Sequence, residues 1–345
     1  MTGVGTRMFV CMKKVLVIRL SAMGDVAIMA PVVKARAMAN RDVLFMVAAP
    51  PRLAPLFVGL DNVRFVPTVK KQSPFKLYRQ LSALKPDIVA DLHFVNRVVL
   101  SDCLFLLHGV KVVHVLKEKM RRRRMMSHRD TRPLTPSWLR YDRVFDRCGL
   151  SPSRLADCAS DYWVPRLPDS DEPQTRRVGI APTAQHQGKI WPLDKMEELV
   201  RQLSLQPGFE LFLFGGPEEK ALLEQWAQRY PHTESLACKL SFADEMQAIS
   251  RLHLMVSMDS ANMHFASCVG VPVVSVWGAT HPDAGFYGWR QNPSNAVQKE
   301  MDCRPCSAFG NKPCRWGDYR CMGEVSVQEV LDKVNSLLFV QHRVE

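Results

Sequence analysis

The segment Arg19-Leu-Ser-Ala-Met-Gly-Asp25 combines small residues with a carboxylate directly after an apolar run. Ser21 and Gly24 would let a ligand approach the backbone closely, and the free N–H groups of a helix start favour an anion. Asp25 could serve there as a general base for a hydroxyl group. The alternative is that its charge only stabilises the first helical turn. Because the segment is not Gly-x-Gly-x-x-Gly, it does not indicate dinucleotide binding.

Two loops of the second half could hold an anionic ligand. Lys189 follows the apolar run 178–181, and its ammonium could neutralise a phosphate or could simply be solvated. Asp259 opens the segment Asp-Ser-Ala-Asn-Met-His, whose backbone N–H groups at a helix start could bind a diphosphate. Asp259 could instead cap that helix, and the histidine could be structural. The residues after Asp259 in this candidate loop are Ser260, Ala261, Asn262 and His264.

Two acidic residues follow the tight turn Gly215-Gly216-Pro217. An acidic side chain at the end of a strand can hold ribose hydroxyls, as it does in nucleotide-binding folds. Glu218 or Glu219 could take this role, and the alternative is a carboxylate that stabilises the start of the next helix.

Four cysteines lie close together near the C-terminus. Their number is sufficient for a zinc site, but the second pair lacks the close spacing typical of zinc ligands. Zinc binding, disulfides and free thiols therefore all remain open for Cys303, Cys306, Cys314 and Cys321.

Alternating apolar runs and helical patterns must position these segments. Strands are expected at 14–20, 43–48, 63–66, 87–92 and 110–115, and again at 178–181, 210–214, 254–258 and 271–277. Helical patterns separate most of them, among them 25–38, 75–84, 97–107 and 193–205. The alternation predicts an α/β protein with two parallel sheets covered by helices. Ligands bind such sheets at the carboxyl ends of the strands, so we expect the site in a cleft between the two halves.

The length of 345 residues suits two domains of about 150 residues each. We expect an N-terminal Rossmann-like domain at 1–164, a linker at 165–176 rich in Pro, Asp and Ser, and a C-terminal Rossmann-like domain at 177–345 that ends in the cysteine-rich segment and a helix. Asp169-Ser-Asp171 resembles a metal-binding motif, but it lies in the expected linker and is discounted.

The net charge of +12 favours an anionic partner, and half of it is concentrated between Lys117 and Arg132. No recognition module or interleaved aromatic residue accompanies this basic run, which argues against nucleic acid. No apolar stretch reaches the ~20 residues that span a bilayer. The scattered cysteines suit a reducing compartment, so we expect a cytoplasmic protein.

Taken in order, these motifs resemble glycosyltransferase family 9, the ADP-heptose:lipopolysaccharide heptosyltransferases. The resemblance rests on the first segment at 19–25, Lys-Ile-Trp-Pro at 189–192, the 259–264 loop, Trp-Gly-Ala-Thr at 277–280 and the cysteine-rich tail. It covers about residues 13 to 335. It implies a GT-B fold, with two Rossmann-like domains facing each other across a cleft, an inverting mechanism, and neither a cofactor nor an obligatory metal.

The resemblance also implies roles for individual residues. Asp25 matches the family's proposed general base, Lys189 the lysine on the donor phosphates, and Glu218 or Glu219 the acidic ribose contact. Residues 259–264 match the donor loop, where the family often has Asp-Thr-Gly-Leu-Ser-His; Ala261 and Asn262 depart from that pattern. Thr183 is a further donor-side candidate, and Ser21 and Gly24 are acceptor-side candidates.

We therefore expect transfer of heptose from an ADP-sugar donor to the inner core of lipopolysaccharide, a lipid A–core glycolipid. The basic run suggests contact with that acceptor and with the anionic inner face of the inner membrane, through Arg121, Arg122, Arg123 and Arg124. The alternatives are a related enzyme that uses another nucleotide sugar and, more remotely, a basic nucleic-acid-binding protein.

Overall fold

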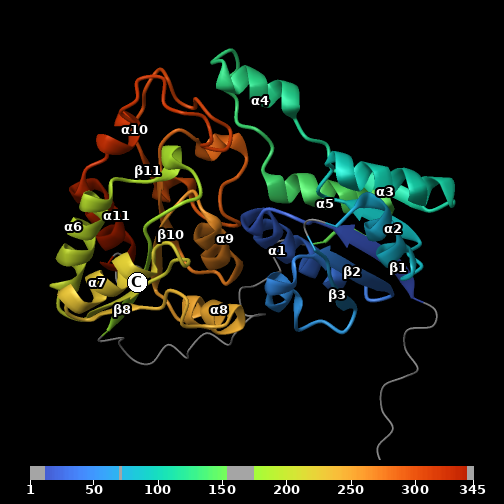
Figure 1. Ribbon diagram of the computed structural model, residues 1–345, viewed down its shortest axis with the longest axis horizontal. Helices are drawn as coiled ribbons and strands as arrows, with labels where there is room; N and C mark the ends of the chain where they lie inside the picture. The colour runs from blue at the N-terminus through green and yellow to red at the C-terminus, as the bar shows by residue number, and fades with distance from the viewer. Residues whose placement is uncertain (1–11, 70–71, 154–174, 340–345) are drawn as a thin grey trace, which may run out of the picture. The chain divides into compact units, whose positions relative to one another are not determined.

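The computed structural model describes residues 12–69, 72–153 and 175–339. Within these ranges the chain forms two compact units. The first contains residues up to Lys117 and the segment that begins at Ser137, and the second contains Glu118–Pro136 and the C-terminal half. Each unit has a parallel sheet covered by helices (Figure 1), which confirms the predicted fold class.

The first unit is built on a five-stranded sheet in the order β3-β2-β1-β4-β5. The central strand, β1, pairs in parallel with β2 and β4, so that Ile18 lies beside both Ala48 and Asp91. The carboxyl ends of these strands therefore share one edge, where the candidate residues lie. The strands are β1 (Lys13–Ile18), β2 (Val43–Ala49), β3 (Val63–Pro67), β4 (Ile88–Asp91) and β5 (Lys111–His114). The helices are α1 (Met23–Ala39), α2 (Pro74–Ser82), α3 (Asn96–Leu107) and α5 (Ser137–Cys148), with a 3-10 helix, η1, at Pro51–Phe57.

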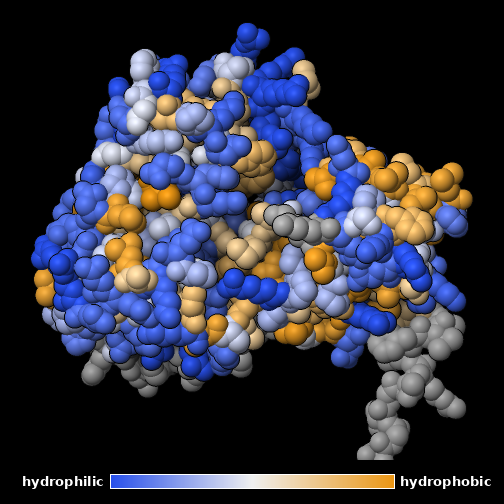
Figure 2. Space-filling model, viewed as in Figure 1, coloured by the Kyte–Doolittle hydropathy of each residue, from blue (hydrophilic) through white to orange (hydrophobic). Residues whose placement is uncertain are grey.

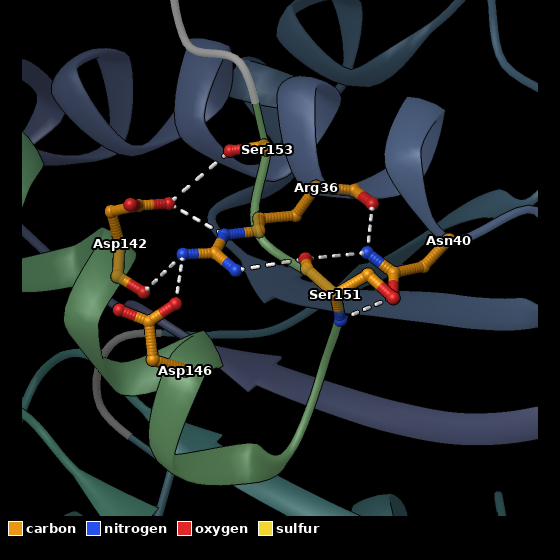
Figure 3. Close-up of polar contacts among 6 residues, drawn as sticks. All are labelled: Arg36, Asn40, Asp142, Asp146, Ser151 and Ser153. Carbon is orange, nitrogen blue, oxygen red and sulfur yellow. Dashed lines mark hydrogen bonds and ion pairs between the residues drawn. The ribbon is translucent and has the colours of Figure 1, made fainter.

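Helix α5, which the sequence patterns did not predict, is joined to α1 by one buried arginine (Figure 3). Arg36 donates from Nε to Asp142 at 2.5 Å, from Nη2 to Asp146 at 2.6 Å and from Nη1 to the Ser151 carbonyl at 2.9 Å. Breaking such a buried network by removing one charge typically costs about 3–5 kcal/mol. Arg36 therefore fixes the position of α5 against α1.

The second unit has a six-stranded sheet in the order β11-β10-β9-β6-β7-β8. Its core includes Trp191 and Trp226, both essentially inaccessible to solvent. The strands are β6 (Arg176–Ala181), β7 (Phe209–Leu213), β8 (Thr233–Ser235), β9 (Leu254–Met258), β10 (Val273–Trp277) and β11 (Ala296–Gln298). The helices are α6 (Leu193–Ser204), α7 (Lys220–Arg229), α8 (Phe242–Ser250), α9 (Ala261–Cys268), α10 (Arg320–Gly323) and α11 (Val327–Phe339), with the 3-10 helices η4 (Gln187–Lys189), η5 (Pro282–Ala284) and η6 (Pro293–Asn295).

The arginine-rich helix α4 (Lys119–Met126) makes its contacts within the second unit. Leu134 N–H donates to the Asp283 carbonyl at 2.8 Å, and Met125 and Leu134 pack with Ala284. The structure therefore differs from the predicted boundary, which placed residues 118–136 in an N-terminal domain of 1–164. Apolar packing by Met125 and Leu134 explains the difference, because it holds the segment on the second unit. Most of the predicted linker, with Asp169–Asp171, lies outside the described residues.

Within the described ranges, no helix combines the length and apolarity needed to cross a membrane.

Candidate active site

Asp25 lies in the first turn of α1, at the carboxyl edge of the first sheet. Its carboxylate forms an ion pair with Arg19, accepts a hydrogen bond from the Ala22 backbone N–H at 3.2 Å, and accepts another from the Tyr141 hydroxyl at 3.3 Å. The hydrogen bond from Ala22 gives Asp25 a role at the start of α1, which is the alternative to a catalytic role that the sequence left open. The side chain nevertheless retains 22% of its accessible surface.

Arg19 and Tyr141 form the buried support of this carboxylate. The Arg19 guanidinium donates to the Leu92 carbonyl at 2.6 Å and lies over the Tyr141 ring. Burial raises the pKa of Tyr141, so the phenol stays protonated and donates to Asp25. Arg19 therefore places a positive charge directly beside the Asp25 carboxylate.

Ser21 and His93 bring a second polar group to the same edge. The Ser21 hydroxyl lies 3.2 Å from His93 Nε2. Burial, with the positive charges of Arg19 and Lys117, lowers the pKa of His93 to about 3. The imidazole is therefore neutral at physiological pH. Gly24 lies beside Asp25 in the first turn of α1.

Beneath His93 lies a buried pair of acidic side chains, Asp91 and Asp102. Asp91 ends β4 and accepts from the backbone N–H groups of His93 and Phe94 at 2.7 and 2.8 Å. Burial and the neighbouring Asp91 raise the pKa of Asp102 to about 9. Asp102 therefore carries a proton at neutral pH and shares it with Asp91. Sequence reasoning missed His93 and both acids, although Asp-Leu-His directly after a buried strand was an available signal.

On the second unit, Lys189 and Asp259 form an ion pair of 2.8 Å between Nζ and Oδ2. Lys189 ends η4 after β6, and Asp259 follows β9. The two strands are neighbours, with Ala181 beside Ser257, which brings together residues that lie 70 positions apart. The structure thus joins two predicted donor-site residues.

The cysteine-rich segment packs against the side chain of Lys189. Gly310 has φ +75°, and a Cβ added to it would lie 2.6 Å from Cγ of Lys189. The backbone of Gly188 accepts from Ala279 N–H at 2.8 Å. The 277–280 motif and the 303–314 loop therefore form the surface on which the Lys189 loop rests.

Helix α9 begins next to this ion pair. Ser260 is its N-cap, and no side chain caps the helix at that position. Asp259 therefore pairs with Lys189 instead of capping, while the Ser260 hydroxyl contacts the Ser257 hydroxyl at 3.0 Å. Ala261 and Asn262 occupy the first turn, and His264 is buried in the helix. The first-turn N–H groups of α9 are consequently available to an anion.

Glu219, not Glu218, lies among the strand ends. Its Oε1 accepts from the Thr183 hydroxyl at 3.0 Å, and its Oε2 accepts from Gly216 N–H at 2.8 Å. Glu218 is exposed. The structure thus separates the two candidates and joins Glu219 to Thr183.

The cysteines Cys303, Cys306, Cys314 and Cys321 are free thiols. Burial raises the pKa of Cys306 and of Cys321. Across the described ranges, no cluster of three or more His, Cys, Asp or Glu side chains is arranged to hold a metal ion. The predicted alternative of zinc ligands thus has no preformed geometry here, and the disulfide alternative is not observed.

Two α/β units, each with a parallel sheet and with charged side chains at the strand ends, are the architecture of a glycosyltransferase of the GT-B type. The chain belongs to glycosyltransferase family 9 (heptosyltransferase), whose family model matches residues 75–314.

Relatives agree with this assignment. Lipopolysaccharide heptosyltransferase 3 of Escherichia coli is 33% identical over 125 residues, which is 35% of each chain. The match thus spans about a third of that relative's length.

Solved structures resemble almost the whole chain. A family 9 glycosyltransferase from Veillonella parvula DSM 2008 has a TM-score of 0.71 at 16% identity and covers 95% of this chain and 98% of its own. E. coli ADP-heptose lps heptosyltransferase II has a TM-score of 0.66 at 18% identity and covers 96% and 99%. The more distant TibC of E. coli, described as an iron-containing dodecameric glycosyltransferase, has a TM-score of 0.56 at 12% identity and covers 96% and 77%. At these identities the likeness supports the fold.

Proposed function

We propose that this protein transfers heptose, with inversion, from ADP-heptose to the inner core of lipopolysaccharide. The observation that carries the proposal is the setting of Asp25 in a family 9 chain. Its carboxylate is held at a strand end by Arg19 and Tyr141, yet it is open to solvent.

In the proposed reaction, Asp25 accepts the proton of the acceptor hydroxyl while that oxygen attacks the anomeric carbon of the donor. The bond from the anomeric carbon to the diphosphate oxygen breaks, and ADP leaves with the electron pair. The proton is transferred as the attacking oxygen forms its bond and becomes more acidic.

Lys189 and the start of α9 would bind the donor diphosphate. An ammonium has three N–H donors, so the pairing with Asp259 orients Lys189 while leaving donors for phosphate oxygens. The first-turn N–H groups of α9 add a second source of positive potential. Both would stabilise the charge that develops on the leaving diphosphate.

Glu219 would bind the ribose hydroxyls of the donor. Each carboxylate oxygen can accept more than one hydrogen bond, so the existing bonds from Thr183 and Gly216 leave capacity. Glu218 is exposed and has no part in this proposal.

The arginine-rich helix α4 would contact anionic groups of the acceptor. A cavity of about 440 Å³ lies between α4 and the 308–312 loop. Its charged lining residues are all basic, namely Lys119, Arg122, Arg123 and Lys312, and Arg122 lies 5.0 Å from the Phe309 ring centroid. Such a lining fits phosphates on a lipid A–core glycolipid.

The remaining parts of the proposal concern cofactors and location. We propose a reaction without a metal or cofactor, since Lys189 and α9 supply the charge for the leaving group. No nucleic-acid partner is invoked. The enzyme would act in the cytoplasm, at the inner face of the inner membrane.

Thermal-shift titration tests the donor. We expect ADP and ADP-heptose to stabilise the protein more than UDP or GDP do at equal concentration, because bound ligand raises stability by mass action. Stronger stabilisation by UDP or GDP would instead favour another nucleotide sugar, an outcome that the departures at Ala261 and Asn262 make worth measuring.

A further inference from the structure

Helix α3 carries apolar side chains on its outer face as well as on the face that packs against the core. Leu100, Cys103 and Leu107 follow a helical stripe, and all three are exposed, with Leu107 at 80% of its full accessible surface. The opposite face buries Val98 and Phe105 in the core, together with Ser101 and Asp102. A helix that only covers a core places its leucines inward, so the outward leucines of α3 point to a partner.

Helix α2 extends this apolar surface. Phe75 is 67% exposed and follows Pro74, whose carbonyl accepts a hydrogen bond of 3.0 Å from the Ser101 hydroxyl. Tyr78 of α2 packs on Phe105 of α3 with ring centroids 4.9 Å apart. The two helices therefore lie side by side (Figure 1). Figure 2 shows hydrophobic surface gathered where α3 lies.

The charges on this face have one sign. Lys76 and Arg79 of α2 are exposed, and Arg97 of α3 is partly exposed. The one acidic residue within the bounds of α2 and α3 is Asp102, which is buried and protonated at neutral pH. The face is thus apolar and cationic, without an exposed carboxylate on either helix.

We infer that the outer face of α2 and α3 docks on an anionic lipid leaflet. Leucine and phenylalanine side chains can enter the acyl boundary while lysine and arginine meet the headgroup phosphates, as in interfacial helices. A second copy of this chain fits less well, because a symmetric contact would set like charges against each other. The surface differs from α4, and the inference does not depend on which sugar is transferred.

Vesicle co-sedimentation tests the inference without donor or acceptor, so its outcome is independent of transferase activity. The full chain is mixed with vesicles of phosphatidylethanolamine and phosphatidylglycerol, or of phosphatidylcholine alone. We expect binding to the anionic vesicles. The double variant Leu100→Ser/Leu107→Ser should bind about tenfold or more weakly, since each leucine loses apolar burial. Both side chains are exposed, so the fold should persist, and circular dichroism and the Tm verify this.

A matched control is Leu205→Ser/Leu240→Ser, which removes two exposed leucines from the second unit and should leave binding unchanged. Lys76→Gln/Arg79→Gln should weaken binding to anionic vesicles and reduce its sensitivity to salt. Binding that is the same for wild type and the α3 variant, or no binding by wild type, would overturn the inference. So would a dimer, measured by light scattering without lipid, that the α3 variant abolishes, because the occupant would then be a second copy.

Discussion

The two strand-end sites contain the same kind of ion pair with the charges exchanged. In the first unit the pair is Arg19–Asp25, with side-chain exposures of 10% and 22%. In the second it is Lys189–Asp259, with exposures of 16% and 7%. In each pair the less exposed partner is a counterion, and the more exposed partner is the one available to a ligand. The first site therefore presents a carboxylate, suited to a hydroxyl, and the second presents an ammonium group, suited to a phosphate.

We propose that each of these pairs serves a ligand as well as the fold. The structural pair Arg36–Asp146 also leaves its carboxylate exposed, so it is the place of these two pairs at the strand ends that suits them to a ligand. Here the buried counterion fixes the orientation and the charge of the accessible group. The predictions below test this division of roles, beginning with the largest expected effect.

Asp25→Asn should lower kcat by about 10²–10⁴, the usual cost of losing a general base. The amide keeps the size of the side chain and can still contact Tyr141. Affinity for ADP, measured by calorimetry, should stay within about twofold of wild type, because the residues that we propose to bind the donor lie on the other unit. Wild-type turnover in the variant would show that Asp25 only serves the start of α1.

Lys189→Met should weaken ADP binding by about 10- to 150-fold, which corresponds to the ~1.5–3 kcal/mol of a charged hydrogen bond. Asp259→Asn is the informative companion. This variant keeps Lys189 but removes its counterion. We therefore expect either a smaller loss of ADP affinity, or tighter phosphate binding together with a lower kcat. If both variants bound ADP as wild type does, the pair would lie outside the donor site.

Asp102→Asn should change stability in a pH-dependent manner. Because the pKa of Asp102 is raised from 3.8 to about 9, the folded chain binds more protons than the unfolded chain between those values. The contribution of Asp102 to the free energy of unfolding therefore falls as pH rises through that range. The amide removes the dependence and can still donate to Asp91, so the Tm should rise by a few degrees at pH 8–9 and hardly change near pH 4. A Tm difference that does not vary with pH would contradict the shared proton.

Much of the fold was predictable from the sequence, because buried parallel strands appear as continuous apolar runs. Leu254–Met258 has the predicted bounds, and α3 lies within one residue of its predicted start. Helix α5 was missed although Tyr141, Val144 and Phe145 repeat with helical spacing, since it follows a stretch rich in proline and arginine. The short edge strands β8 and β11 gave no comparable signal.

The site was predictable as separate segments but not as pairs. Lys189 and Asp259 each follow a strand, yet their contact depends on β9 lying next to β6, and strand order is a property of tertiary packing. Tyr141 reaches Asp25 from α5, a helix that Arg36 joins to α1. Asp102 looked like an ordinary helix residue, and its protonation comes from burial against Asp91. These features arise from contacts between residues far apart in the sequence, which local patterns do not encode.

Residues 118–136 belong to the second unit, although the residues on either side of them belong to the first. This arrangement determines how the enzyme can be divided or recombined. The polypeptide passes from one unit to the other after Lys117, returns after Pro136, and passes again before the C-terminal sheet begins. A fragment that starts at the C-terminal sheet would lack α4 and leave the apolar surface around Ala284 without Met125 and Leu134. Exchange of the second unit between related enzymes therefore requires two inserted pieces of chain, and a single crossover point would yield a hybrid with an incomplete unit.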